Sequence, residues 1–526
     1  AVSGRPTRRL TWNDVADEVA RMVVLLHDLG LRKDDVILCQ LPNSVDQFIV
    51  YMACAKLGLI VTPVPAQYRQ HELAHVIAAT DAKAAVTAQR IGRHAHAEMI
   101  AALRSNCPSL QHVLAYGRGL PSGVLDLDAE IAKVTDPARA RLYEAQAASS
   151  ANDVFTVCWT SGTESRPKGV PRSFNEWLVQ SQAVADSARL VAGHRLLSPF
   201  PMVNMAGIAS SFMAWLLSGS TVIQHHPFDL AIFLQQIRDE RPHYSCAAPA
   251  VLNMLLKQPQ LLEGINFDTL RILGSGSAPL SEWMIREFRD RYGVEVQNMF
   301  GSNEGMSLPG TAGDIPEPAM RAAYFPRIGV PGFDWQASVN GKIVTRLVDP
   351  STEAEVTEPG QSAEMRIKGP TVFSGYWRAP ELTASAFDAE GYFKTGDNFE
   401  IAGDKGQYYR FCGRLKDMVI RGGMNISLEE LESLLEGHPK VREVAIVGWP
   451  DEVMGERVCA CIAPVKGTEV TLEEIVAWLR DEKKIAAFKL PERLMLLDSL
   501  PRNPVGKIIK RELRDKVQVL AEKARS

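Results

Sequence analysis

The sequence has few cysteines and no excess of either charge. Eight cysteines are scattered over 526 residues, and none of them forms a CxxC pair. This pattern speaks against a zinc site or a disulfide framework and favours a reduced, cytoplasmic protein. The formal net charge is −4, from 58 basic and 62 acidic residues. A nucleic-acid-binding protein usually has a basic excess, so any anionic ligand must be held by local positive groups.

The sequence also lacks a long apolar run. A membrane-spanning helix needs about 18 or more consecutive apolar residues, and the most apolar stretch, 49–66, is interrupted by Lys56, Pro63 and Pro65. No membrane span is therefore predicted. The chain begins with Ala1 instead of Met, which leaves the natural N-terminus and a cleaved targeting peptide open.

What the sequence does contain is an alternation of helical and strand patterns. Residues 12–29 have the 3.6-residue spacing of a helix, 34–41 read as a short apolar strand, and 44–57 read as a second helix. This alternation predicts an α/β fold with parallel sheets covered by helices. After about residue 330, glycines, prolines and polar turns become dense, which indicates a β-rich subdomain over about 330–413.

The last hundred or so residues have a third pattern. VREVAIVGWP and CACIAPV predict strands, and 471–481 predict an amphipathic helix. Cys459 and Cys461 alternate within the second strand, so we expect them on one face. We predict a large N-terminal domain over 1–413, a boundary at 414–417, and a small α+β C-terminal domain over 417–526.

The most specific local signal is WTSGTESRPKG at 159–169, which follows a strand of β-branched and aromatic residues. Hydroxyls and backbone N–H groups at this density can wrap a phosphate, and Lys168 adds a positive charge. The pattern GxxxxGK[ST] is absent, so this is not a P-loop. A surface turn is the alternative interpretation of such a composition.

This loop resembles the phosphate-binding signature [YW]TSGTTGxPKG of the adenylate-forming superfamily, which includes acyl-CoA synthetases, aryl-acid ligases and luciferases. Glu164 and Ser165 stand where that signature has Thr-Gly. Further motifs resemble the family's in the same order, namely GSGSAP at 274–279, NMFGSNE at 298–304, YFKTGD at 392–397, GRLKD at 413–417 and PRNPVGK at 501–507. These motifs are spread over residues 159–507, and the resemblance covers nearly the whole chain, from LTW at 10–12 to Arg511.

The resemblance implies a set of residues that bind ATP and AMP. Among them, Phe300 would stack on adenine, and Asp397 and Arg414 would contact the ribose, since a carboxylate can accept both hydroxyls of a cis-diol. Asn303 replaces a threonine that touches the α-phosphate in the family. The implied set is Thr160, Ser161, Gly162, Thr163, Lys168, Gly276, Ser277, Ala278, Pro279, Asn298, Met299, Phe300, Gly301, Ser302, Asn303, Asp397 and Arg414.

The same resemblance assigns the catalytic and moving parts. Lys507 is implied as the catalytic lysine, and Glu304 as the ligand of Mg²⁺, which prefers hard oxygen ligands. Lys416 stands at the family's hinge, about which a mobile small domain rotates between two half-reactions. Gly422 and Gly423 would line the pantetheine tunnel.

By the same resemblance, we expect Asn204, Met205, Gly207 and Ser275 to line the acid pocket. These residues are small, apolar or neutral, and a buried ammonium would find no carboxylate partner among them. We therefore predict a compact apolar acid, either alicyclic, aromatic or medium-chain, instead of an amino acid. The segments RQHEL at 69–73, FGSNEG at 300–305 and RGGMNIS at 421–427 resemble those of ligases of the cyclohexanecarboxylate-CoA and 2,3-dihydroxybenzoate-AMP types.

The resemblance thus implies an AMP-forming acyl-CoA synthetase that uses ATP, Mg²⁺ and CoA. Too few residues follow Lys507 for a carrier domain, so we expect the acceptor to come in trans. CoA is the first choice, and a free carrier protein is the alternative. A luciferase-like monooxygenase shares these motifs and is the less favoured reading. The sequence leaves the oligomeric state open, a homodimer included.

Overall fold

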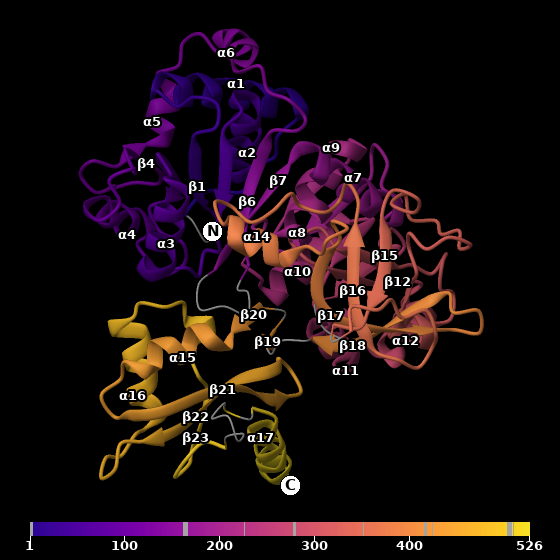
Figure 1. Ribbon diagram of the computed structural model, residues 1–526. Helices are drawn as coiled ribbons and strands as arrows, with labels where there is room; N and C mark the ends of the chain where they lie inside the picture. The colour runs from indigo at the N-terminus through magenta and orange to yellow at the C-terminus, as the bar shows by residue number, and fades with distance from the viewer. Residues whose placement is uncertain are drawn as a thin grey trace.

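The computed structural model describes residues 4–160, 167–225, 227–276, 280–350, 352–414, 418–422, 424–501, 508 and 510–525. Within these ranges the strands form four sheets. Three belong to the large part of the molecule, and the fourth lies in a separate lower body that ends at the C-terminus (Figure 1). The predicted α/β architecture, a large N-terminal part and a smaller α+β part, is confirmed.

The first sheet has seven strands in the order β5-β4-β3-β1-β2-β6-β7. All neighbours are parallel except β6 and β7, which form an antiparallel hairpin. Its strands are β1 (Val36–Gln40), β2 (Ile60–Pro63), β3 (Ala84–Ala88), β4 (His112–Tyr116), β5 (Leu125–Asp126), β6 (Val154–Thr160) and β7 (Lys168–Ser173). The accompanying helices are α1 (Trp12–Asp28), α2 (Val45–Leu57), α3 (Gln70–Thr80), α4 (His96–Ala102), η1 (Leu103–Ser105), α5 (Leu127–Ala132) and α6 (Arg139–Ala147).

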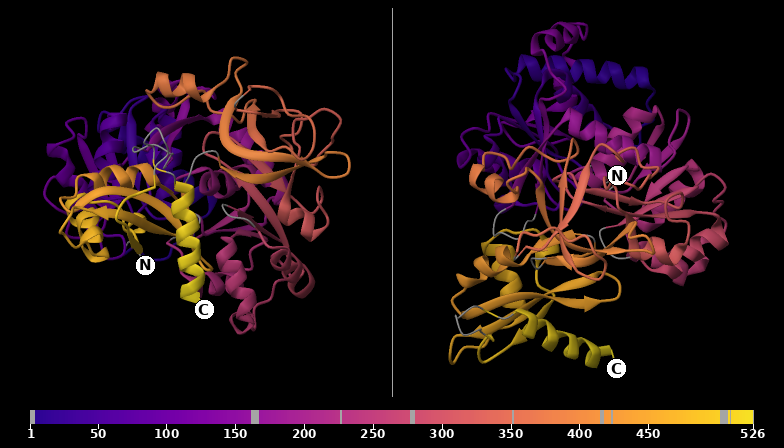
Figure 2. Two further views of the ribbon diagram at one scale, coloured as in Figure 1. Left: turned by 60° about the horizontal axis from the view of Figure 1, so that its bottom comes forward. Right: turned by 45° about the vertical axis from the view of Figure 1, so that its right-hand side comes forward.

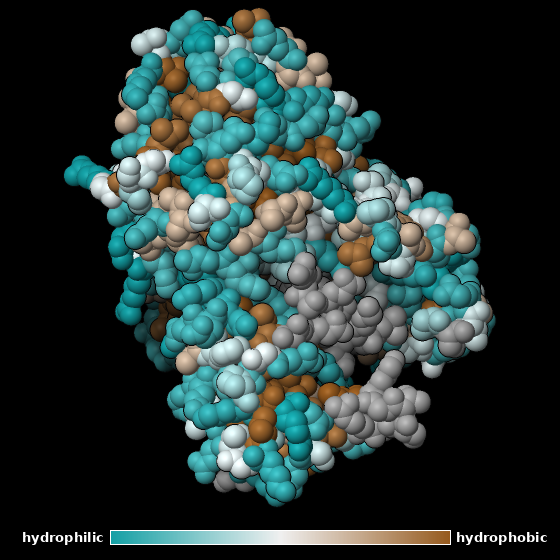
Figure 3. Space-filling model, turned by 60° about the vertical axis from the view of Figure 1, so that its left-hand side comes forward, coloured by the Kyte–Doolittle hydropathy of each residue, from teal (hydrophilic) through white to brown (hydrophobic). Residues whose placement is uncertain are grey.

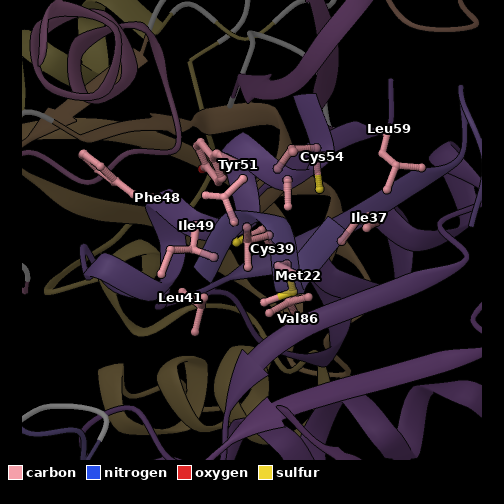
Figure 4. Packing of buried hydrophobic residues seen from close by; sticks show 14 of the residues in the cluster. Met22, Ile37, Cys39, Leu41, Phe48, Ile49, Tyr51, Cys54, Leu59 and Val86 are labelled. Carbon is pink, nitrogen blue, oxygen red and sulfur yellow. The ribbon is translucent and has the colours of Figure 1, made fainter. Parts of the chain in front are cut away.

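Both faces of this sheet are buried, which explains the continuous apolar strands in the sequence. Along β1, Ile37 and Cys39 pack in the cluster that contains α1 and α2, whereas Val36 and Leu38 pack in the cluster on the α3 side. Figure 4 shows the first of these clusters from close by. Helix α1 begins with a capping box in which Thr11 and Asp14 bond each other's backbone N–H groups.

The second sheet has the order β13-β12-β11-β10-β8-β9, parallel except for the β12–β13 pair. Its strands are β8 (Arg195–Ser198), β9 (Thr221–Gln224), β10 (Tyr244–Cys246), β11 (Ile272–Gly276), β12 (Glu295–Gly301) and β13 (Ser307–Gly310). The helices around it are α7 (Phe174–Ser187), α8 (Met205–Gly207), the π-helix η2 (Ile208–Met213), α9 (Ala214–Ser218), α10 (Leu230–Glu240), α11 (Pro249–Lys257), η3 (Pro259–Leu262), α12 (Glu282–Tyr292) and α13 (Pro318–Ala323).

The third sheet is antiparallel, with the order β14-β18-β17-β16-β15. It comprises β14 (Tyr324–Pro326), β15 (Val344–Val348), β16 (Ala363–Lys368), β17 (Phe393–Ala402) and β18 (Tyr408–Arg414), with α14 (Pro380–Ala386) between β16 and β17. This is the region whose glycine- and proline-rich texture predicted a β-rich subdomain.

The fourth sheet is built from β19 (Met418–Arg421), β20 (Met424–Ser427), β21 (Val441–Asp451), β22 (Gly455–Pro464) and β23 (Arg493–Leu496). Helices α15 (Leu428–Glu436) and α16 (Leu472–Ala477), the latter continued by the π-helix η4 (Trp478–Glu482), pack on one face. The 3₁₀ helix η5 (Ala487–Lys489) precedes β23, and α17 (Lys510–Arg525) packs on the other face together with Cys459 and Cys461. The expectation that these cysteines share a face is confirmed.

All eight cysteines are free, and none forms a disulfide. No described helix combines the length and the apolar character that crossing a bilayer requires. Figure 3 shows one face of the molecule, where hydrophilic side chains predominate and apolar ones form small patches between them.

Candidate active site

Two of the predicted nucleotide motifs, GSGSAP and NMFGSNE, lie side by side at the carboxyl edge of the second sheet. Strands β11 and β12 are parallel neighbours, with Ser275 opposite Asn298 and Gly276 opposite Met299. A Cβ on Gly276 would lie 1.9 Å from the carbonyl oxygen of Met299, so only glycine fits this approach. Ligands of open α/β sheets bind at this edge. The continuation of the first motif, Ser277, Ala278 and Pro279, lies outside the described residues.

The glycine-rich loop connects the two strands of the β6–β7 hairpin. Thr160 and Lys168 are paired across its base, whereas Ser161, Gly162 and Thr163 lie outside the described residues. The Thr160 hydroxyl is buried and has no hydrogen-bond partner among the described residues. Because a buried hydroxyl without a partner is costly, a ligand oxygen at this position would stabilise it.

Lys168 and Glu304, from two separate motifs, both interact with Tyr376. The Lys168 Nζ is 4.7 Å from the centre of the Tyr376 ring, a cation–π distance. The Tyr376 hydroxyl donates a hydrogen bond of 3.2 Å to Oε1 of Glu304. Lys168 and Tyr376 also line an open cavity of about 320 Å³ with Trp159 and Trp377. The tyrosine therefore joins the cation of the loop to the carboxylate assigned to Mg²⁺.

The backbone around Tyr376 ties the loop and the Glu304 turn together. The N–H of Phe373 donates to the carbonyl of Glu304 at 2.9 Å, and the N–H of Trp377 donates to the carbonyl of Gly169 at 2.8 Å. Gly305 has φ +111°, and a Cβ there would lie 1.9 Å from the carbonyl oxygen of Thr371. The segment 371–377 thus straps the two motifs in place.

A buried arginine donates hydrogen bonds to the backbone of this segment and of the Glu304 turn. Arg172, on β7, donates from Nη1 to the carbonyls of Thr371 at 2.7 Å and of Asn303 at 3.3 Å. Burial lowers the pKa of Arg172 from its ordinary value. Sequence reasoning missed Tyr376, Arg172 and Thr371. The run GPTVFSGYW at 369–377 shows only the glycine- and proline-rich pattern of the β-rich subdomain, and nothing in VPRS at 170–173 indicates a buried cation.

Three of the expected site side chains are bonded to backbone groups. Asn298 donates from Nδ2 to the carbonyl of Arg321 at 3.0 Å, and Ser275 donates to the carbonyl of Ala247 at 2.8 Å. The Asn303 Oδ1 accepts the N–H of Met205 at 2.7 Å. In this structure Asn298 and Ser275 hold neighbouring segments in place, and Asn303 connects the Glu304 turn to the expected acid pocket.

The acid-pocket segment is a short helical turn. The Asn204 Oδ1 accepts the N–H of Gly207 at 3.1 Å and so caps α8. Met205 and Gly207 are buried, and Met205 packs in the same core cluster as Phe212. The segment continues directly into the π-helix η2, a feature that is frequent at functional sites.

Phe300 lies in an aromatic cluster between β12 and the third sheet. Its ring centre is 5.2 Å from those of Phe399 and Phe411 and 5.6 Å from that of Phe325. Phe300 and Met299 stay partly exposed, Gly301 is exposed, and the Ser302 hydroxyl is buried without a partner among the described residues. The Phe300 ring is thus packed against three aromatic rings, while the residue as a whole stays partly exposed.

The two residues assigned to the ribose are cross-strand partners. Asp397 on β17 is opposite Arg414 on β18, and Asp397 is only 4% exposed. The preceding Thr395 hydroxyl donates to the carbonyl of Met365 at 2.7 Å, which fixes the turn before Asp397. The strand register therefore brings together TGD and GR, two motifs that are separate in the sequence.

In the small domain, Gly422 lies at the turn of the β19–β20 hairpin, and its N–H donates to the carbonyl of Met454 at 2.8 Å. Gly423, Lys416 and Lys507 lie outside the described residues. On either side of Lys507, Leu500 and Ile508 pack with α17 on the face of the sheet that holds Cys459 and Cys461.

Fold and site together define an adenylate-forming enzyme. Residues 1–377 match the AMP-binding enzyme family, and residues 430–507 match the AMP-binding enzyme C-terminal domain. The chain belongs to this family, and the resemblance inferred from the motifs is confirmed.

Individual relatives cover nearly the whole chain. It is 30% identical to a medium-chain fatty-acid–CoA ligase of Escherichia coli, over 92% of this chain and 82% of the relative. It is also 30% identical to a feruloyl-CoA synthase of Amycolatopsis, over 96% and 93%. The crystal structure of ATP-bound MatB from Rhodopseudomonas palustris is 27% identical, covers 98% of this chain and 95% of its own, and has a TM-score of 0.65.

Proposed function

We propose that the chain is an AMP-forming carboxylic acid:CoA ligase that activates its acid with ATP and then forms a thioester. The observation that carries this proposal is that Tyr376 links Lys168 to Glu304. The register pair of Asp397 and Arg414 supports it. Family membership and two relatives named as CoA ligases support the same reaction.

The residues fit a magnesium ion that is shared with ATP. Glu304 is partly exposed, and only its Oε1 has a hydrogen bond from a described residue. Among the described residues no three His, Cys, Asp or Glu side chains gather in a way that could hold a metal. A Mg²⁺ ion on Glu304 would therefore take its other ligands from phosphates and water, and would neutralise charge on the phosphate oxygens.

In the first half-reaction a carboxylate oxygen of the acid attacks the α-phosphorus of ATP. An oxygen–phosphorus bond forms, the bond to pyrophosphate breaks, and negative charge builds on the phosphate oxygens. Lys168 and the loop that begins at Thr160 would bind these oxygens, because such transfers depend mainly on positioning and electrostatics. Asp397 and Arg414 would hold the ribose, and Lys507 would lie between the acid and the α-phosphate.

In the second half-reaction the CoA thiol attacks the acyl carbonyl. The carbon–sulfur bond forms, the acyl–phosphate bond breaks, AMP leaves, and the thiol proton is released. The Gly422 hairpin would border the path of the pantetheine arm. The mobile small domain would present Lys507 for the first step and this hairpin for the second, by rotation at Lys416.

The proposed substrate is a compact apolar acid. The segment that contains Asn204, Met205 and Gly207 is capped by a neutral amide and packed among apolar side chains. No Asp or Glu occurs within 200–210 or 272–276, so an ammonium group would be buried without a partner. A carrier protein in trans is the alternative acceptor. A cytoplasmic location is proposed on the basis of the free cysteines.

The test is ATP–pyrophosphate exchange across a panel of medium-chain, aromatic, alicyclic and amino acids, followed by thioester detection with CoA. We expect exchange with an apolar acid and an acyl-CoA product, and neither with the variant Lys168→Ala. Exchange without acyl-CoA would favour a carrier protein as the acceptor. Exchange with no member of the panel would contradict the proposed activity.

A further inference from the structure

The small domain is docked on the large domain through a buried ionic contact. Lys489, in η5, is 1% exposed. Its Nζ lies 2.9 Å from both carboxylate oxygens of Glu430 on α15, and 3.7 Å from Oε1 of Glu72 on α3. Glu430 and Lys489 belong to the small domain, whereas Glu72 belongs to the large domain, where α3 faces the small body (Figure 1).

Glu72 makes a second bond between the domains. Its Oε1 accepts the backbone N–H of Ala486 at 2.8 Å, and its Oε2 accepts the N–H of Arg69 at 3.0 Å, which caps α3. Ala486 packs in the apolar cluster of the large domain, and Phe488 packs against clusters of both domains. The contact is therefore dry, and Glu72 itself is 1% exposed.

The lysine in this contact is charged. Burial lowers the pKa of Lys489, but the neighbouring Glu430, Tyr68 and Glu72 outweigh burial and raise it above its ordinary value. Removing one partner of such a buried set leaves an uncompensated charge. The Lys489–Glu430 pair lies within the small domain and can persist in any orientation. The bonds of Glu72 to Lys489 and Ala486 exist only in the orientation seen here.

The orientation seen here fits the second half-reaction. The small domain docks through the side that carries α15 and η5. The residues that flank Lys507 pack on the opposite face of its sheet, with α17. In Figures 1 and 2 the β19–β20 hairpin lies next to the large domain, and α17 lies at the far end of the small one. The described residues on either side of Lys507 therefore lie on the face of the small domain opposite the docked one, whereas the Gly422 hairpin lies on the side next to the large domain.

We propose that Glu72 is a positioning residue for thioester formation, because it holds the small domain in this orientation through Lys489 and the N–H of Ala486. This rests on the proposed function. Glu72 has no part in adenylate formation, since Lys507 must then face the site and the bonds of Glu72 to the small domain must be broken.

The test compares the two half-reactions in the variant Glu72→Ala, made in the whole chain. ATP–pyrophosphate exchange reports the first, and single-turnover conversion of supplied acyl-AMP with CoA reports the second. Because a buried polar contact is lost, we expect the rate of the second half-reaction to fall about tenfold. The rate of ATP–pyrophosphate exchange should stay within about twofold of wild type.

Two further variants separate positioning from damage to the fold. Ala486→Pro removes the other end of the bond at a residue whose φ of −66° already suits proline, and it should reproduce the Glu72→Ala pattern. Glu474→Gln is the matched control, since Glu474 caps α16 as Glu72 caps α3 but pairs with Lys440 within the small domain. Both half-reactions should be unchanged there.

Equal loss of both half-reactions in Glu72→Ala, or loss of neither, would overturn the positioning role. Absence of exchange in the wild-type protein with every acid would instead contradict the proposed function. The two failures are therefore distinguishable.

Discussion

Two lysines of this protein, Lys168 and Lys489, lie beside tyrosine rings in contrasting surroundings. Lys168 is partly exposed at the base of the glycine-rich loop, with the Tyr376 ring linking it to Glu304. Lys489 is buried between Glu430 and Glu72, with its Nζ 5.5 Å from the Tyr68 ring. A cation meant to meet a ligand is left accessible, whereas a cation that joins two domains is enclosed with its counter-charges.

Replacing each lysine by methionine should have the largest effects, on stability at Lys489 and on activity at Lys168. Lys489→Met leaves two buried carboxylates without their cation, so we expect a loss of about 3–5 kcal/mol in unfolding free energy. Lys168→Met should change stability by less than about 1 kcal/mol while abolishing exchange. Urea unfolding of both variants measures the difference, and equal stability losses would contradict the comparison.

Lys507→Ala should separate the half-reactions in the direction opposite to Glu72→Ala. We expect exchange to fall by about 10²–10³, as for removal of one group that stabilises developing charge. Conversion of supplied acyl-AMP with CoA should stay near the wild-type rate. If both rates fell alike, Lys507 would not be specific to adenylate formation.

Tyr376→Phe tests whether the hydrogen bond from Tyr376 positions Glu304. The ring beside Lys168 is kept, but the hydrogen bond to Glu304 is lost, so exchange should fall about three- to tenfold. We also expect a higher Mg²⁺ concentration for half-maximal rate, which distinguishes positioning of Glu304 from a general loss of packing. An unchanged Mg²⁺ dependence would contradict a role of Tyr376 in positioning Glu304.

Asp451→Asn should have the smallest effect. Although burial raises the pKa of Asp451, Arg457 and the N–H groups of Met454 and Val453 lower it to about 2. Because the folded-state pKa is below the unfolded one, this stabilisation is present above about pH 4 and is lost as the pH falls toward 2. Since the group is near the surface, we expect about 1 kcal/mol at pH 7. Unfolding of both proteins at several pH values measures it, and a pH-independent difference would contradict the assignment.

The sequence predicted those parts of the fold and site that depend on local pattern. Helix 12–29, the apolar strand after it and the shared face of Cys459 and Cys461 follow from periodicity alone. The register between strands and the contacts between distant segments could not be predicted from the sequence. Nothing local shows that Asp397 and Arg414 are opposite each other, that Tyr376 joins Lys168 to Glu304, or that Glu72 meets a residue more than four hundred positions away. Such contacts depend on the tertiary arrangement, so only the structure could supply them.

The most direct test measures both half-reactions in Lys168→Ala and Glu72→Ala with one apolar acid, ATP and CoA. The proposed account predicts that Lys168→Ala loses pyrophosphate exchange, and that Glu72→Ala keeps exchange but converts acyl-AMP to the CoA thioester about tenfold more slowly. Parallel loss of the two activities in both variants would contradict it.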